Sequence, residues 1–228
     1  MRRGALLALL AAIAAGCGSG SGSGSGRATV WITRDRGSQV MHVAGVPAGL
    51  TAMQAISRVA KVESRYGGRY VRAVDGLREH GRTAWFYYVN GYLADRSAAA
   101  YRLRAGDVEW WDYRSWRDPA QDPVVVGAFP EPFLQGYDGK RRRTVIVATE
   151  PDRVRVLARR LHASIAPPGS GLLARGVNVI AVGPGARTTA ELTFTHGTSP
   201  GSPVRLAFSG DPEVLLRRWP FRFRYSVR

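Results

Sequence analysis

Few residues in this sequence have the types and spacing that metal binding or catalysis requires. Its four histidines are scattered along the chain, with no pair four residues apart and no neighbouring cysteine: His42, His80, His162 and His196. Zinc sites use clustered histidine and cysteine, so this pattern predicts no metal site.

The sequence also lacks a nucleophile and an acid–base pair. Cys17 is the single cysteine and belongs to an N-terminal leader. No Gly-x-Ser-x-Gly elbow occurs, and Gly183-Pro184-Gly185 lacks the spacing of a dinucleotide-binding loop. Glu109 and Asp112 have opposite parity in one predicted strand, so their carboxylates should point to opposite faces. We therefore expect a protein that is not an enzyme and needs no cofactor.

Aromatic side chains concentrate in two predicted strands, 85–89 and 108–113. The Asn90-Gly91 pair between 85–89 and 92–93 favours a type I′ hairpin turn, because both residues tolerate positive φ. Alternation along the strands predicts four aromatic side chains on one uncovered face: Phe86, Tyr88, Trp111 and Tyr113. Four exposed aromatic side chains on one surface indicate that something binds or packs there. That partner is either a flat ligand or the C-terminal half of the chain.

The elements around these strands predict a small α+β domain. A helix over 51–62 has apolar residues every three to four positions, with Thr51 as its cap. Alternating apolar residues predict the strands, which are 28–33, 39–43, 70–74, 85–93 and 108–113. The order ββαβββ is typical of a β-grasp-like sheet crossed by one helix.

The sequence Asp-Pro-Ala-Gln-Asp at 118–122 is typical of a linker. The pattern of residues 123–228 predicts a second small α/β domain. Pro151 suits the first turn of a helix, which lies between apolar runs at 144–148 and 178–182, so we expect a β-α-β unit. Further strands are expected at 191–195, 204–208 and 221–227.

The N-terminus has the pattern of an export signal. Arg2 and Arg3 precede an apolar run over 5–15, which is too short to span a bilayer. Ala14-Ala15-Gly16-Cys17 resembles a bacterial lipobox, so we expect residues 1–17 to be a signal peptide with a lipidated Cys17 anchored at the outer face of the cell membrane. The alternative is an ordinary cleaved signal with an incidental cysteine. The Gly/Ser alternation over 18–26 predicts a flexible tether.

The formal net charge is +16, and all but two of the 33 basic residues are arginine. Export makes nucleic acid a poor expectation for the partner. A basic surface outside the cell more plausibly meets anionic lipid or wall polymer. The run 140–143 is expected to be a solvated loop.

Several motifs, in order and spacing, resemble one family. They are Val46–Met53, Tyr66-Gly67-Gly68, Val74-Asp75-Gly76, Trp85–Gly91 and Leu103–Val108. Together they resemble the DUF4430 family, which is similar to the C-terminal β-domain of transcobalamin and intrinsic factor. The resemblance covers roughly residues 27–117 and implies non-catalytic binding of a corrinoid such as cobalamin, for delivery to a membrane transporter.

Combining the resemblance with the aromatic pattern gives eight candidate ligand contacts: Tyr66, Trp85, Phe86, Tyr88, Asn90, Tyr92, Trp111 and Tyr113. In the vitamin carriers a separate α-helical domain completes the site, and this chain has no such domain. The alternative function is a protein- or cell-wall-binding adhesion module with no small-molecule ligand, in which the aromatics form an interdomain core.

Overall fold

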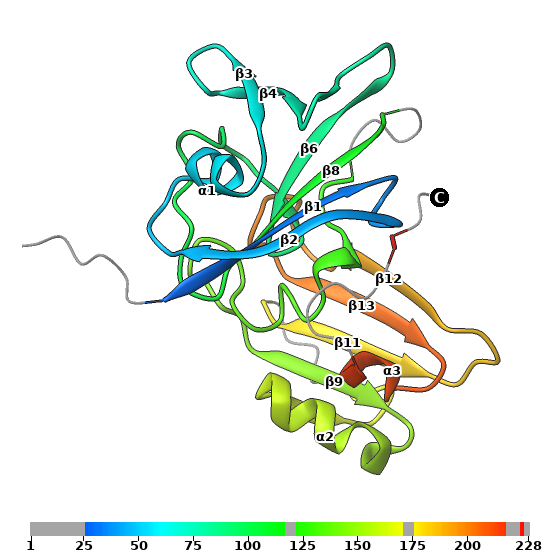
Figure 1. The fold of residues 1–228 in the computed structure, drawn as a ribbon. Helices are drawn as coiled ribbons and strands as arrows, with labels where there is room; N and C mark the ends of the chain where they lie inside the picture. The colour runs from blue at the N-terminus through cyan, green and yellow to red at the C-terminus, as the bar shows by residue number, and fades with distance from the viewer. Residues whose placement is uncertain (1–25, 117–121, 171–175, 218–223, 226–228) are drawn as a thin grey trace, which may run out of the picture.

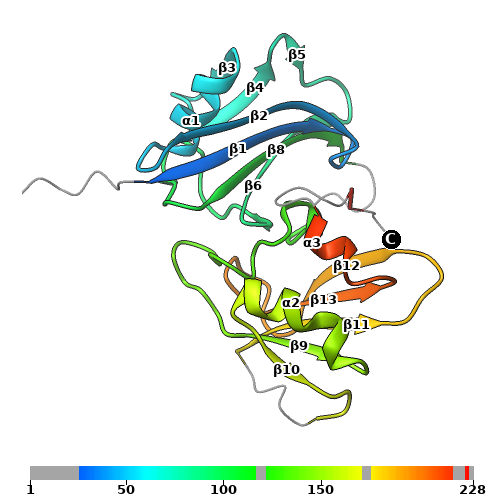
Figure 2. The ribbon, with the colours of Figure 1, turned by 60° about the horizontal axis from the view of Figure 1, so that its bottom comes forward.

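The computed structural model describes residues 26–116, 122–170, 176–217 and 224–225. These residues form two lobes stacked on one another, each built on a five-stranded sheet (Figure 1, Figure 2). The predicted leader with Cys17, most of the tether, the linker up to residue 121 and most of the predicted strand 221–227 lie outside the described residues. The mixed α+β class predicted from the sequence is confirmed.

The first lobe has the strand arrangement of a β-grasp-like fold. Its main sheet has the order β2-β1-β8-β6-β7, and β1 runs parallel to β8. Strands β3, β4 and β5 form a separate small sheet, whereas the sequence predicted a strand at 70–74 in the main one. The elements are β1 (Arg27–Arg34), β2 (Gln39–Pro47), α1 (Ala52–Val59), β3 (Val62–Arg65), β4 (Tyr70–Val74), β5 (Leu77–Arg78), β6 (Thr83–Val89), β7 (Tyr92–Leu93) and β8 (Val108–Ser115).

Helix α1 begins where the sequence predicted. The Thr51 hydroxyl accepts from the Gln54 amide, and the Gln54 side chain accepts from the Thr51 amide, which completes a capping box. Ala52, Ala55 and Ile56 form its buried stripe. The helix ends at Val59, because Val62 already belongs to β3.

The second lobe has a mostly parallel sheet with the order β10-β9-β11-β13-β12. The predicted β-α-β unit is present, but β9 leads through α2 to β10, a short strand that contains Ile165, which the apolar pattern had assigned to the helix. Helices α2 and α3 lie in front of this sheet in Figure 2. The elements are η1 (Val126–Ala128), β9 (Thr144–Ala148), α2 (Pro151–Leu161), β10 (Ser164–Ala166), β11 (Asn178–Gly183), β12 (Thr189–Phe194), β13 (Val204–Ser209) and α3 (Val214–Arg217).

The register of β6 on β8 corrects the predicted aromatic face. Tyr88 pairs with Trp110, and Tyr87 pairs with Trp111. Directly paired residues share a face, so Phe86 and Tyr88 lie on the face of Trp110. Trp111 and Tyr113 lie on the opposite face, with Trp85 and Tyr87. The prediction that Phe86, Tyr88, Trp111 and Tyr113 share one face was wrong, because parity within a strand does not give the register between strands.

Candidate functional site

One face of the first sheet is the contact surface between the lobes. The Trp110 ring stacks on Trp31 with centroids 4.4 Å apart and meets the edge of Tyr225 at 5.3 Å. Gly127 of η1 packs so closely on Trp110 that a methyl group there would approach the ring to 2.2 Å. Trp110 is fully buried, so this face is covered by residues from the C-terminal half.

The opposite face is buried beneath α1 and the small sheet. Tyr87 stacks on Trp111 at 4.9 Å, and the Trp111 indole donates to the Glu109 carboxylate at 2.6 Å. Full burial raises the pKa of Glu109 well above its usual range. Glu109 and Asp112 lie on opposite faces, as their parity predicted: the Thr33 hydroxyl donates to Asp112 at 2.6 Å on the lobe-contact face. The two carboxylates therefore cannot act as an acid–base pair.

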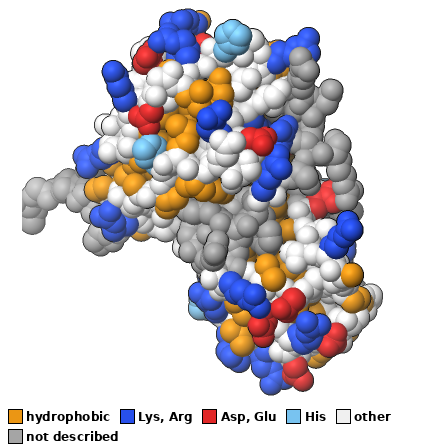
Figure 3. Space-filling model, turned by 45° about the vertical axis from the view of Figure 1, so that its right-hand side comes forward, with side chains coloured by type: hydrophobic (Ala, Val, Ile, Leu, Met, Phe, Trp, Pro, Cys, Tyr) orange, Lys and Arg blue, Asp and Glu red, His pale blue; other side chains and the backbone are white. Residues whose placement is uncertain are grey.

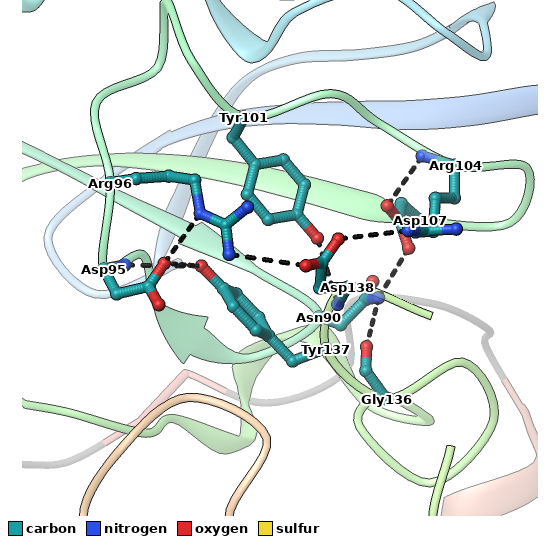
Figure 4. A network of polar contacts seen from close by, with 9 residues as sticks. All are labelled: Asn90, Asp95, Arg96, Tyr101, Arg104, Asp107, Gly136, Tyr137 and Asp138. Atoms are coloured by element: carbon teal, nitrogen blue, oxygen red, sulfur yellow. Dashed lines mark hydrogen bonds and ion pairs between the residues drawn. The ribbon is translucent and has the colours of Figure 1, made fainter. Parts of the chain in front are cut away.

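The Asn90-Gly91 turn has the predicted geometry, with φ of 50° and 83°. It is also completely covered. The Asn90 amide donates to Asp107 at 2.7 Å and to the Gly136 carbonyl at 2.6 Å, and its oxygen accepts from the Val108 amide at 2.7 Å (Figure 4). Each hydrogen-bonding position of this side chain that a ligand would need is already satisfied.

The same network continues toward the surface and holds the two halves of the chain together (Figure 4). Asp138 accepts from Arg104 at 3.2 Å and from Arg96 at 3.4 Å. The Arg96 guanidinium lies 5.3 Å from the ring centre of Tyr101 and 6.0 Å from that of Tyr137. These contacts fix the segment around Tyr137 against the first lobe.

Glu131 is a buried carboxyl in the segment that covers the turn. Its Oε2 accepts from the Gln135 amide at 2.8 Å. Burial and the nearby carboxylate of Asp107 raise the pKa of Glu131 to about 8. Burial also raises the pKa of Asp107. The contact between the lobes therefore contains two acids whose pKa values are raised by burial.

The eight predicted contacts separate into three groups by exposure. Five are buried: Trp85, Tyr88, Asn90, Tyr92 and Trp111. Phe86 and Tyr113 are half-buried; the Arg114 guanidinium lies 4.3 Å above the Phe86 ring, and the Tyr113 hydroxyl donates to the Arg78 carbonyl. Tyr66 is 75% exposed. The structure does not bring Tyr66 together with the other seven.

The β3–β4 hairpin is an exposed surface that the sequence analysis named only at Tyr66. Tyr66, Gly67 and Gly68 have positive φ, and the turn projects away from the main sheet (Figure 1). Tyr70 is 37% exposed, and Arg69 is exposed without an ion-pair partner among the described residues. The sequence signal was the interleaved Arg65–Tyr70 run, Arg-Tyr-Gly-Gly-Arg-Tyr.

Basic side chains are spread over both lobes on the face seen in Figure 3 rather than gathered in one patch. The two ends of α2 differ, however. At its start, Arg153 and Arg155 pair with Glu150 and Asp152. At its end, Arg159 has no acidic partner in the described part of the chain, and the nearby Arg141 donates to the Leu161 carbonyl.

In the part of the chain that the structure describes, no group of three or more His, Cys, Asp or Glu is arranged to hold a metal ion. Each helix there is too short or too polar to cross a membrane.

The first lobe is thus a β-grasp-like module joined to a small α/β lobe. The model of the family Domain of unknown function (DUF4430) matches residues 49–115, which confirms the resemblance over the part of the first lobe from α1 to β8. Strands β1 and β2 lie outside the matched range but complete the same sheet.

Two solved structures are similar to part of the chain. One is a "putative metal binding protein" from Ruminococcus gnavus ATCC 29149, with 18% identity and a TM-score of 0.32, covering 40% of this chain and 97% of that one. The other is haptocorrin in complex with Cbi, with 17% identity and a TM-score of 0.33, covering 40% of this chain and 25% of haptocorrin. No curated protein matches the chain.

Proposed function

We propose that the protein is a non-catalytic binding protein, anchored by lipid on Cys17 to the outer face of the cell membrane, and that its first lobe binds its ligand through the β3–β4 hairpin. The observation that carries this proposal is the 75% exposure of Tyr66. Most of the other aromatic side chains that were expected to contact a ligand are buried in the protein core.

The hairpin combines two kinds of contact. Tyr66 and Tyr70 offer flat apolar rings, and Arg65 and Arg69 offer guanidinium donors beside them. Part of the charge is balanced within the protein, because Arg65 lies 3.7 Å from Glu79. Arg69 remains available to an acceptor on a ligand.

A corrinoid is the ligand class we propose for this surface, for delivery to a membrane transporter. Its flat macrocycle suits stacking on tyrosine, and the amide groups at its rim suit guanidinium donors. The DUF4430 match includes the hairpin.

Titration of residues 27–228 with cobalamin and cobinamide, followed by visible absorbance and tryptophan quenching, tests the proposal. We expect saturable one-to-one binding that Tyr66→Ala weakens at least about fivefold, since a lost stacking contact is worth about 1 kcal/mol. The matched control is Trp116→Ala, which removes another exposed aromatic, 44% exposed, at the end of β8. No binding at ~100 µM corrinoid, or an equal loss of corrinoid affinity in the two variants, contradicts the proposal.

The second candidate is an adhesion module that contacts anionic polymer or lipid of the envelope. Arg159, which has no acidic partner among the described residues and lies at the basic end of α2, favours it. Binding to anionic vesicles that falls steeply with salt, and that Arg159→Ala weakens while Tyr66→Ala does not, would support this candidate over corrinoid capture.

A further inference from the structure

The second sheet has one face that the helices leave open. Pairing places Ala181, Ala207 and Glu191 in one row across β11, β13 and β12, and Gly183, Ser209 and Thr189 in the next row. The opposite face, with Ile180, Leu206 and Phe208, is the one in the main hydrophobic core with α2 and α3. The open face therefore carries small side chains where a covered sheet would carry large ones.

Among the described residues, an apolar cluster covers one end of the open face. Val145, Ala166, Val177 and Val179 form a small apolar cluster at the amino-terminal end of β9 and β11. At the other end, toward which the arrowheads of β9, β11 and β13 point in Figure 1, the rows of Ala181 and Gly183 border a groove of about 620 Å³. This volume is within the range of small-molecule sites, and such sites prefer the carboxyl ends of parallel strands.

The groove is polar and has more positive than negative groups. Its charged lining residues are Arg205, Arg224 and Glu191. Arg205 is exposed and has no ion-pair partner among the described residues, whereas Arg224 pairs with Asp35 of the first lobe at 3.0 Å. Hydroxyl groups of Thr188 and Thr189 also line it, together with Ser209, whose hydroxyl already donates to the Pro184 carbonyl at 3.0 Å.

We propose that this groove binds a linear anionic oligosaccharide. The guanidinium of Arg205 would pair with a carboxylate on the sugar, since arginine binds carboxylates through two parallel hydrogen bonds. The hydroxyl groups match sugar hydroxyls, and the floor of alanine and glycine leaves room for a ring to lie flat on the sheet. The groove is in the second lobe and uses no residue of the β3–β4 hairpin.

Calorimetric titration of residues 27–228 with trigalacturonate, with maltotriose as the neutral probe, tests this inference. We expect saturable binding of trigalacturonate. Maltotriose should bind at least about tenfold more weakly, because it lacks the carboxylate that makes one charge-assisted contact. Arg205→Ala should weaken trigalacturonate binding about tenfold. Ala207→Trp, which fills the floor at an exposed position, should abolish it while circular dichroism stays unchanged.

The matched control is Arg58→Ala, which removes the same charge from an exposed position of α1 in the first lobe, outside the groove. We expect it to change the affinity less than about twofold. Equal loss of affinity in Arg58→Ala and Arg205→Ala would overturn the inference in favour of diffuse attraction. Equal binding of the two sugars, or no saturation up to ~1 mM, would also overturn it. Tyr66→Ala should leave this binding unchanged, so the result does not depend on the corrinoid proposal.

Discussion

Two of the glycine-containing turns in the first lobe have opposite surroundings. Asn90-Gly91 and Tyr66-Gly67-Gly68 both reverse a strand with residues of positive φ, and both carry aromatic neighbours. The first is covered by the segment 123–136, with the Val125 amide donating to the Gly91 carbonyl at 2.8 Å. The second is exposed. Local sequence thus predicts the turn, but the rest of the chain decides whether the turn can meet a ligand.

The covered turn explains how the two lobes become one structure. Trp110 and Asn90 each contact residues that are distant in sequence, and both are buried. The exposed turn joins only neighbouring strands. Substitutions should therefore affect stability near the covered turn and ligand binding near the exposed one.

Trp110→Ala should give the largest loss of stability. The ring is fully buried between Trp31, Tyr88 and Tyr225, so we expect the free energy of unfolding to fall by about 3–5 kcal/mol, measured by urea denaturation. Trp116→Ala, on an exposed ring, should cost less than about 0.5 kcal/mol. Similar values for the two would break the contrast between buried and exposed aromatics.

Raising the pH should loosen the contact between the lobes. The folded-state pKa of Glu131 is raised to about 8, above its unfolded value near 4.3, so its stabilising effect is complete below about pH 4 and is lost as the pH rises through about 8. We expect the free energy of unfolding to fall on the order of 3 kcal/mol between about pH 5 and pH 9. Glu131→Gln should make the decrease in the free energy of unfolding over this pH range smaller. A stability that rises over the same interval would contradict the prediction.

Asn90→Ala should cost about 2–3 kcal/mol, because it leaves the Val108 amide and the Gly136 carbonyl without their buried partner. Asn90→Gly is a useful second variant, since glycine adopts the positive φ readily but lacks the side-chain amide. If the glycine variant recovers full stability in thermal unfolding, backbone conformation and not the hydrogen-bond network is what Asn90 supplies.

Tyr66→Ala should change the free energy of unfolding by less than about 0.5 kcal/mol, the smallest effect of the series. The side chain is exposed and makes no hydrogen bond in the described residues. Differential scanning calorimetry would check this. A shift of more than about 1 kcal/mol would show that the hairpin is structural and remove the contrast with Asn90.

Sequence reasoning succeeded for most features that local sequence determines, although it extended the first helix beyond Val59. It placed the Thr51 cap, the Asn90-Gly91 turn, the start of α2 at Pro151 and the opposite faces of Glu109 and Asp112. It failed at the register of β6 on β8, because the 14 residues between β7 and β8, 94–107, set no fixed offset between the strands. It also could not show that residues 123–136 cover the turn, since that depends on contacts over long sequence separations.

The contact of Tyr225 with the first lobe has a consequence for the order of folding. Its hydroxyl lies 3.4 Å from Asp112, and its ring packs on Trp110. A chain is synthesised from its N-terminus, so the sheet made by residues 27–115 cannot complete its packing until Tyr225 has been translated.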